Sequence, residues 1–516
     1  MKRISLLVLL LCAFQLSNSQ NTWSDDVALI LYDNCTSCHR QGGIAPFTLM
    51  DYESASNNAY PIVEAVTSGY MPPWSPDPSY QNYAHERLLS AGEIQTLVDW
   101  LAAGSPEGNT DIAPPPPVYP EDGFILNAPD LEVQMEEYTS QATAFSDDYI
   151  CVSLPLGLTS TKKLRAFEVI PGNTQIVHHC LLFVDESGNY ESDFGGNCVG
   201  PTDGLIGGYT PGAVPTIFPS DGADLNMGVT IPPGSNLVLA MHFPEGSAGE
   251  TDATKVRLYF YEDEVAIREI TTDPILQNWS FDLPADEITP VDANYNLIPQ
   301  DVSLLSVFPH MHLLGHKIKS YGVTLADDTI PFIDIPHWDF EWQQFYAFES
   351  IQVVPAWTSL IAEGEFDNTP FNSHNPNDPP IDVYPGLNTA DEMFIVYFQF
   401  LPYETGDEDL DITELTNLPS FIEEVNGSQG LIEVNAYPNP FTSTVNLEMY
   451  LENSATVSLH IYDHQGKRVA EVANQENHPT GDLLLTWTPE IGLSKGNYYY
   501  SLMINGQASS GIIQLQ

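Results

Sequence analysis

The alternation of apolar and polar residues predicts β-strands over most of this 516-residue chain. Between residues 131 and 408, short alternating runs are separated by Pro-Gly, Gly-Gly and Asn-Pro turns, with little helical periodicity. Every second side chain of a strand points to the same face, so these runs fit antiparallel sheets with one buried face. The predicted fold class is multidomain and mainly β, with two antiparallel β-sandwiches in this region.

The N-terminal region shows helical spacing instead. A helix-like run begins at Ser90, continues through Leu101 and is ended by Gly104 and Pro106, which predicts a small α-helical domain. The row of prolines at residues 114–117 predicts a stiff linker that holds this domain at a distance from the next core.

Alternating strands return near the C-terminus, for example at residues 457–463, and predict a third, smaller β-sandwich. Residues 404–428 before it are acidic and irregular, and are expected to be largely linker.

The chain begins with Lys2 and Arg3, an apolar stretch from Ile4 to Phe14 and small residues, which predicts a secretory signal peptide. No later apolar run reaches the roughly 18 residues that a membrane-spanning helix needs. The predicted segments are a signal peptide (1–19), a helical domain (20–108), a Pro-rich linker (109–130), two β-sandwiches (131–275 and 276–408), a linker (409–431) and a C-terminal β-sandwich (432–516).

Acidic residues outnumber basic ones by 70 to 15, giving a formal net charge of −55. Nucleic acids and anionic membrane surfaces are bound through basic patches, so this excess argues against both as partners.

Three cysteines, Cys151, Cys180 and Cys198, lie outside the signal peptide and the Cys-x-x-Cys motif described below. An odd number in an exported protein indicates one disulfide and one buried thiol. We expect the bridge between Cys180 and Cys198.

Histidines are concentrated in the apolar runs. His310 and His312 are two residues apart and would share one face of a strand, where they could bind one metal ion. Met393 opens another apolar run and could join them. We call these three residues the His-Met set.

A second group, which we call the three-histidine set, consists of the neighbours His178 and His179 together with His242 at the end of a strand-like run. Neighbours face opposite sides of a regular strand, so a bulge or the use of different ring nitrogens would be required here. His316, His337 and His374 fit neither set and are expected at the surface or around a site.

Ligand chemistry indicates the metal for each set. A thioether favours Cu(I), and no cysteine near the His-Met set offers a blue-copper site, so this set indicates copper that can bind dioxygen. The three-histidine set suits copper or zinc. The alternative is that these histidines and Met393 are ordinary core residues.

The order His-His, Met-His-Phe, His-Met-His-Leu and Asp-Glu-Met over about residues 130–405 resembles the copper type II, ascorbate-dependent monooxygenases. This family includes the peptidylglycine α-hydroxylating and dopamine β-monooxygenases. The resemblance implies two copper ions, one on each sandwich with an open cleft between them. The three-histidine set then corresponds to the electron-transferring copper, and the His-Met set to the catalytic, oxygen-binding copper.

The N-terminal domain contains Cys35, Cys38 and His39 in a Cys-x-x-Cys-His motif, which suits covalent haem attachment with the histidine as iron ligand. Met71, in a proline-fixed loop, is the expected sixth ligand, with His85 as the alternative. The domain resembles a small c-type cytochrome carrying one haem c. A chance Cys-x-x-Cys disulfide is the other interpretation.

The Tyr-Pro-Asn-Pro-Phe motif at residues 437–441 resembles the C-terminal sorting domain of the type IX secretion system. The resemblance implies export through the periplasm and across the outer membrane by that machinery, to the cell surface or the medium. A structural or carbohydrate-binding β module is the alternative.

These features lead to the hypothesis of a secreted copper-dependent monooxygenase that hydroxylates a C–H bond of a small-molecule or peptide substrate with dioxygen. Electrons would pass through the haem from an external donor, either an ascorbate-like reductant or a redox protein. The rival hypothesis is a non-enzymatic electron-transfer or copper-handling surface protein. A zinc hydrolase ranks last, because no general base stands at a recognisable spacing.

Overall fold

The chain is mainly β, as predicted, and divides into two compact units at residues 1–419 and 420–516. None of the helices in the described part has the length and apolar character needed to span a bilayer. The predicted signal peptide lies outside the described residues. The computed structural model describes residues 20–41, 43–119, 125–126, 128–143, 146–198, 200–416, 434–451, 454–462, 468–489, 493, 495–504 and 507–515.

The first unit begins with a helical part whose core is formed by Trp23, Leu31, Leu97 and Trp100. Its last helix starts where the sequence predicts, because the side chain of Ser90 accepts a hydrogen bond from the backbone of Glu93 and the Glu93 side chain returns one. The elements are η1 (Trp23–Val27), α1 (Ala28–Asn34), α2 (Tyr52–Asn57), α3 (Ala59–Ser68), α4 (Ala91–Ala102) and η2 (Thr110–Ile112).

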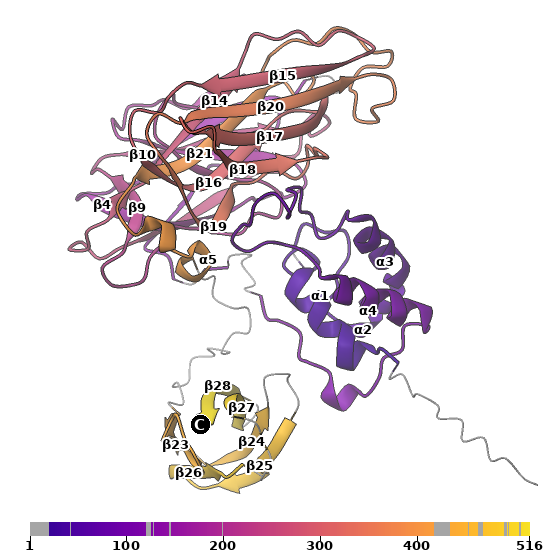
Figure 1. Cartoon of the computed structure of the whole chain (residues 1–516), viewed down its shortest axis with the longest axis vertical. Helices are drawn as coiled ribbons and strands as arrows, with labels where there is room; N and C mark the ends of the chain where they lie inside the picture. The colour runs from indigo at the N-terminus through magenta and orange to yellow at the C-terminus, as the bar shows by residue number, and fades with distance from the viewer. Residues whose placement is uncertain are drawn as a thin grey trace, which may run out of the picture. The chain divides into compact units, whose positions relative to one another are not determined.

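Residues 74–87, which we call the docking segment, leave the helical part and pack on the β-sheets. Ala84 donates a backbone hydrogen bond to Ala347 at 2.8 Å, and the Tyr83 hydroxyl donates one to the carbonyl of Phe332 at 2.8 Å. Tyr83 is buried in a β-sandwich core. The prediction that the prolines hold the helical domain at a distance is therefore wrong, because residues 74–87, outside the linker, contact the sheets. Figure 1 shows the helices α1 to α4 in indigo to violet and the strands of the first unit from magenta to orange.

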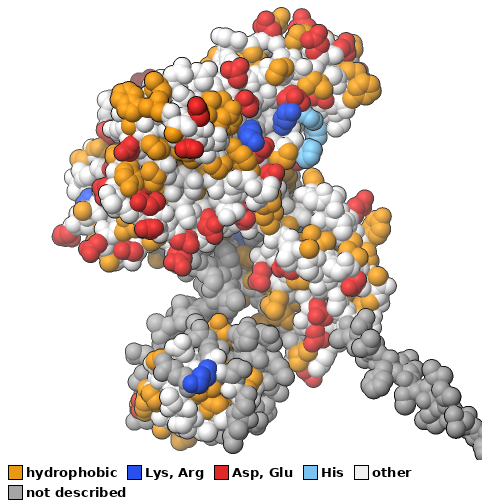
Figure 2. Space-filling view, viewed as in Figure 1, with side chains coloured by type: hydrophobic (Ala, Val, Ile, Leu, Met, Phe, Trp, Pro, Cys, Tyr) orange, Lys and Arg blue, Asp and Glu red, His pale blue; other side chains and the backbone are white. Residues whose placement is uncertain are grey.

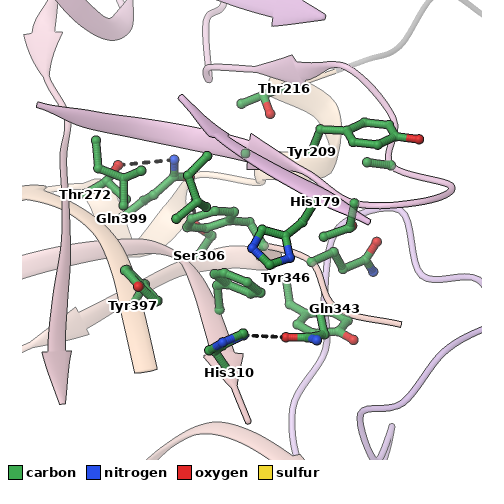
Figure 3. Close-up of a pocket in the computed structure, with 18 of the residues that line it drawn as sticks. His179, Tyr209, Thr216, Thr272, Ser306, His310, Gln343, Tyr346, Tyr397 and Gln399 are labelled. Atoms are coloured by element: carbon green, nitrogen blue, oxygen red, sulfur yellow. Dashed lines mark hydrogen bonds between the residues drawn. The ribbon is translucent and has the colours of Figure 1, made fainter. Parts of the chain in front are cut away.

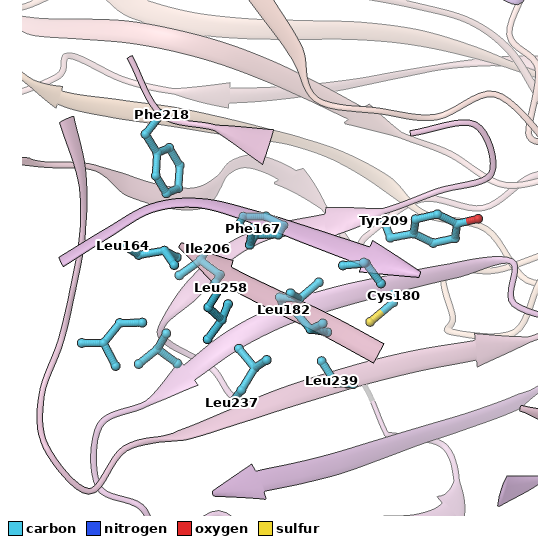
Figure 4. Packing of buried hydrophobic residues seen from close by; sticks show 14 of the residues in the cluster. Leu164, Phe167, Cys180, Leu182, Ile206, Tyr209, Phe218, Leu237, Leu239 and Leu258 are labelled. Carbon is cyan, nitrogen blue, oxygen red and sulfur yellow. The ribbon is translucent and has the colours of Figure 1, made fainter. Parts of the chain in front are cut away.

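Two sheets enclose the first β core, in the strand orders β1-β12-β4-β9-β13, with β8 beside β4, and β6-β3-β10-β5-β7. Side chains such as Phe167, Leu182 and Leu258 meet between them (Figure 4). The strands are β1 (Leu131–Gln134), β3 (Asp148–Pro155), β4 (Lys162–Ile170), β5 (His179–Asp185), β6 (Asp193–Gly196), β7 (Leu205–Tyr209), β8 (Thr216–Ile217), β9 (Met227–Ile231), β10 (Asn236–Phe243), β12 (Lys255–Phe260) and β13 (Arg268–Glu269), with the pair β2 (Tyr138–Thr139) and β11 (Thr251–Asp252) forming a separate small sheet.

Two four-stranded sheets enclose the second core, in the orders β14-β21-β16-β19 and β15-β20-β17-β18. Phe332, Phe366, Phe394 and Phe398 fill it. The strands are β14 (Thr271–Asn278), β15 (Glu287–Tyr295), β16 (Val302–His310), β17 (Gly315–Val323), β18 (Thr329–Ile335), β19 (Tyr346–Val354), β20 (Ser359–Asn368) and β21 (Phe394–Pro402).

Part of the predicted acidic linker is folded. The 3₁₀-helix η3 (Asp407–Asp409) and the helix α5 (Ile412–Leu415) pack beside β19, and Ile412 is buried in the first β core. Asp407 is buried because the guanidinium of Arg268 pairs with its carboxylate at 2.6 Å. The linker prediction is wrong for these residues, and residues 417–433 lie outside the described part.

The second unit contains the sheets β22-β23-β26 and β25-β24-β27-β28 around a core that includes Phe441, Trp487 and Tyr498. Its strands are β22 (Asn435–Tyr437), β23 (Val445–Leu451), β24 (Ala455–Tyr462), β25 (Arg468–His478), β26 (Gly481–Trp487), β27 (Gly496–Ile504) and β28 (Gln507–Leu515). Acidic side chains are scattered over the visible face of the molecule, where basic ones are few, in keeping with the net charge (Figure 2).

The disulfide joins Cys151 to Cys198, with Cα atoms 5.7 Å apart, and Cys180 is a buried free thiol. One bridge and one thiol were predicted, but the expected pairing of Cys180 with Cys198 is wrong. Cys180 packs in the core between the sheets, whereas Cys151 and Cys198 lie in a separate cluster with Phe183 and Val238. Adjacent residues of a strand face opposite sides of the sheet. Whether two cysteines can pair therefore depends on the face that each occupies, and not on the number of residues between them.

Replacing Cys198 with Ser should lower the free energy of unfolding by about 4 kcal/mol, because the bridge closes a loop of 47 residues. Urea unfolding of the variant measures this loss. Cys180→Ser removes one free thiol and leaves the bridge intact, so it is the control when the free thiols of each variant are counted. A non-reduced peptide map that links Cys180 to another cysteine would contradict the assignment.

Candidate metal centre

The three-histidine set is assembled by two neighbouring strands. His179 on β5 and His242 on β10 are cross-strand partners, and His178 precedes β5. The Nδ1 atom of His179 lies 3.2 Å from Nδ1 of His178 and 3.2 Å from Nδ1 of His242. Since His178 stands before the regular strand, its ring reaches the same side as that of His179 without a bulge. The ligand atoms of this set lie within 4.8 Å of one another, as a metal site requires.

Aromatic rings and a carboxylate hold these imidazoles in place. Tyr149 stacks on His242 with ring centroids 4.3 Å apart, and Phe340 stacks on His178 at 4.6 Å. Asp147 Oδ2 lies 3.4 Å from Nε2 of His242. The Nε2 atom of His178 is buried and has no hydrogen-bond partner among the described residues, so packing orients this ring.

The histidines of the His-Met set present their Nε2 atoms. His310 ends β16, His312 follows it, and their ring centroids are 5.1 Å apart. Nδ1 of His310 lies 2.6 Å from Oε1 of Gln343, and Nδ1 of His312 lies 3.0 Å from the carbonyl of Asp391. Both partners are acceptors, so each Nδ1 carries the proton and each Nε2 keeps a lone pair for a metal.

Glu392 attaches the segment bearing Met393 to the histidine turn. Its buried carboxylate accepts backbone hydrogen bonds from His312 at 2.9 Å and from Leu314 at 2.6 Å. Burial raises the pKa of Glu392 to about 8, although these N–H donors act in the opposite direction. Met393, the next residue, lines the same cavity as His310 and His312.

A cavity of about 480 Å³ between the two sandwiches is lined by all six residues of the two sets except His242. The ring centroids of His179 and His310 are 6.3 Å apart. In Figure 3, His179 comes from the strands of the first sandwich, and His310, joined to Gln343 by a dashed line, from the second. The wall is largely apolar, with side chains such as Leu181, Phe308 and Tyr397.

The docking segment completes the wall of this cavity. Trp74, Ala84, His85 and Arg87 line it from the helical side. The guanidinium of Arg87 donates to the carbonyl of Gly212 and to Oε1 of Gln344, each at 3.1 Å. The helical part therefore shapes the same space as the two ligand sets.

Burial keeps four rings of the sets neutral, those of His178, His179, His310 and His312. Burial lowers the pKa of His310 to about 4 and that of His312 to about 3. It also lowers the pKa of His178 and His179 well below the ordinary value. Burial alone would raise the pKa of Asp147, but its contacts with His242 and Thr389 bring it below the ordinary range. Neutral imidazoles are the form that binds metals.

The residues of the Cys-x-x-Cys-His motif fit covalent haem attachment. Cys35 and Cys38 form no disulfide with each other, and Nδ1 of His39 lies 3.1 Å from the carbonyl of Phe47. A proton on Nδ1 leaves the lone pair of Nε2 for iron. Met71 is half-buried in the loop after α3, whereas Nε2 of His85 lies 3.0 Å from the hydroxyl of Thr416. His85 is thus engaged with the residue that follows α5, which favours Met71 as the second axial candidate.

His316, His337 and His374 are exposed, in agreement with the surface position expected for them. Sequence reasoning missed the residues around the ligands, chiefly Asp147 and Gln343. Glu392 carried a signal, since it stands inside the Asp-Glu-Met motif. Asp147 and Gln343 carried none, because only tertiary packing brings them to the histidines.

Residues 435–513 match the family model described as the secretion system C-terminal sorting domain. The chain therefore carries a type IX sorting domain, which directs export across the outer membrane to the cell surface or the medium. No curated protein matches the chain.

Similar solved structures share little with the chain. One is a Parabacteroides merdae β-glucuronidase, with 12% identity, 44% of this chain and 27% of that chain covered, and a TM-score of 0.13. Another is the infectious bursal disease virus VP2 subviral particle, with 9% identity, 59% of this chain and 87% of that chain covered, and a TM-score of 0.14. A third is Escherichia coli α-2-macroglobulin, with 12% identity, 75% of this chain and 23% of that chain covered, and a TM-score of 0.14. The match thus spans 27% of the length of the glucuronidase chain. These values carry no argument about function.

Acid should destabilise the metal-free protein. The unfolded chain protonates its histidines below about pH 6.5, whereas the buried rings stay neutral until their lowered pKa is reached. Unfolding then takes up protons. The contribution of these histidines to the free energy of unfolding is therefore fully present above about pH 6.5, and it is lost as the pH falls toward 4. Urea unfolding at pH 7 and pH 5 measures the loss. His310→Gln should reduce it, and the exposed His316→Gln should not; equal losses in both variants would contradict the explanation.

Deleting residues 432–516 should leave the rest of the chain folded but retained in the periplasm, because the first unit has its own cores. Cell fractionation of the truncated protein, with circular dichroism as a check on folding, tests this. Delivery of the truncated protein to the cell surface at the normal level would refute the export role.

Proposed function

We propose that the protein is a secreted copper-dependent monooxygenase that hydroxylates a C–H bond. The observation that supports this most strongly is that two ligand sets of different chemistry, one all-imidazole and one with a thioether, border a single apolar cavity. The two sets suit copper that transfers an electron and copper that binds dioxygen, in the order that the sequence resemblance implies.

The three-histidine set would hold one copper through its convergent Nδ1 atoms, and His310, His312 and Met393 would hold the other. Copper bound in these two sets would supply one-electron transfer and the activation of dioxygen. The protein contributes the rest: Gln343 and the carbonyl of Asp391 fix the rings of the His-Met set, and the thioether of Met393 favours the reduced metal.

The cavity would bind the substrate next to Met393. Its largely apolar lining favours a substrate with an apolar reacting group. Its volume of about 480 Å³ admits a small molecule or the end of a peptide.

The helical part would supply electrons through a haem on Cys35 and Cys38 with His39 as a ligand and Met71 as the second axial residue. A second cavity, lined by Cys38 and by Tyr209 of β7, lies beside the motif, and Tyr209 also lines the cavity of the ligand sets. Tyr209 is the cross-strand partner of Cys180, the neighbour of His179. An external reductant or redox protein would then reduce the haem.

Metal and haem analysis of the purified protein tests the proposal directly. Two coppers and one covalent haem per chain are expected, together with oxygen uptake coupled to product formation on a panel of substrates. Copper and haem without substrate-dependent oxygen uptake would favour the non-enzymatic electron-transfer alternative, and zinc without copper would overturn both.

Met393→Leu should abolish hydroxylation and weaken Cu(I) binding at one site only. The substitution conserves volume, so it should cost less than about 1.5 kcal/mol of stability while removing the soft ligand. Met311→Leu is the matched control, since Met311 lies between His310 and His312 but is buried in the second β core. Cu(I) titration and oxygen uptake compare the variants. Full activity and normal copper content in Met393→Leu would show that Met393 only packs.

A further inference from the structure

Asp147 is a buried carboxylate that contacts both β-sandwiches. It stands before β3 and is 5% exposed. Its Oδ1 accepts a hydrogen bond from the backbone N–H of Glu245 at 2.9 Å, and its Oδ2 accepts one from the backbone N–H of Thr389 at 2.8 Å. The same Oδ2 lies 3.4 Å from Nε2 of His242. One side chain thus joins a ligand candidate of the first sandwich to the segment before Met393.

Two groups lie 3.4 Å from Nε2 of His242, Oδ2 of Asp147 and the hydroxyl of Thr389. A hydroxyl can donate or accept, so the carboxylate decides which nitrogen of His242 is available. An ionised carboxylate only accepts hydrogen bonds, so it favours a proton on Nε2 and leaves the lone pair on Nδ1. Nδ1 is the atom that lies 3.2 Å from Nδ1 of His179, inside the three-histidine set. Partners of this kind around metal-binding histidines fix both tautomer and ring orientation.

Thr389 carries the link into the second sandwich. The side chain of Asn388 donates to Oδ2 of Asp391 at 2.8 Å and closes the turn of residues 388–391, which includes Thr389. The carbonyl of Asp391 then accepts from Nδ1 of His312 at 3.0 Å. Contacts therefore run without a gap from His242 through Asp147 and residues 388–391 to His312.

We propose that Asp147 is a positioning residue that orients His242 for metal binding through Nδ1 and ties the His-Met set to the three-histidine set. The two sets belong to different sandwiches, so their spacing depends on contacts that cross the junction, among them the packing of Leu305 and Leu401 of the second sandwich into the first core. The part of the inference that concerns copper rests on the proposed function. The tie between residues 147 and 389 does not depend on any metal.

Asp147→Asn in the full-length protein tests both parts. An amide has one acceptor oxygen. With its NH₂ group in the place of Oδ2, it loses the backbone bond from Thr389 and would shift the ring proton of His242 to Nδ1. With its NH₂ group in the place of Oδ1, it loses the backbone bond from Glu245. Asp148→Asn is the matched control: Asp148 is 2% exposed and accepts instead from the hydroxyl of Tyr138 and the backbone of Gln141.

Copper(II) affinity is measured by competition with a chelator, and amide hydrogen exchange of residues 385–393 is measured on the metal-free protein. Asp147→Asn should weaken copper binding at the three-histidine set by roughly 10- to 100-fold and speed exchange in this segment, while Asp148→Asn does neither. Wild-type affinity and exchange in Asp147→Asn, or equal losses in the control, would overturn the inference.

Wild-type protein that takes up no copper would defeat the proposed function, and the exchange of residues 385–393 would then decide the tie by itself. A measurement without substitution guards against a variant that does not fold. Nitrogen-15 spectra of histidine-labelled, metal-free wild type should show His242 with its proton on Nε2. A proton on Nδ1 would overturn the inference.

Discussion

The candidate site depends on the burial of uncharged imidazoles between two apolar cores. A buried polar nitrogen costs free energy unless it has a partner, and each ring has two such atoms. Gln343, the carbonyl of Asp391 and Asp147 engage one nitrogen each of His310, His312 and His242. A proton held on one nitrogen by an acceptor leaves the lone pair on the other nitrogen of the same ring. The loops that provide these acceptors therefore determine which nitrogen of each ring is available to a ligand.

The sheets supply the frame for this arrangement. His179 and His242 come together because β5 and β10 pair in antiparallel register, and His310 stands opposite Ile395 because β16 pairs with β21. Each ligand therefore lies at the end of a strand whose interior is fixed by core packing. Strand ends at the junction of two sandwiches can face a cavity, whereas strand centres are occupied by the cores.

Much of the fold and of the ligand sets could be predicted from the sequence, because both depend on local patterns. Alternation predicted the sheets, and the spacing of His310 and His312 predicted that their rings lie close together. The pairing of Cys151 with Cys198 could not be predicted, because it depends on which face of a sheet each thiol occupies. The docking segment and Asp147 were missed for the same kind of reason, since their partners lie far away in the sequence.

The docking segment attaches the helical part of the first unit to its β-sheets. A helical domain on a flexible tether could be exchanged, lost or moved along the chain without altering the β-sheets. Here Tyr83 is buried in a sandwich core and Arg87 bonds to loops of both sandwiches, so the helical part shares its stability with the sheets. A substitution in the docking segment can therefore alter a cavity built mainly from residues more than a hundred positions away in the sequence.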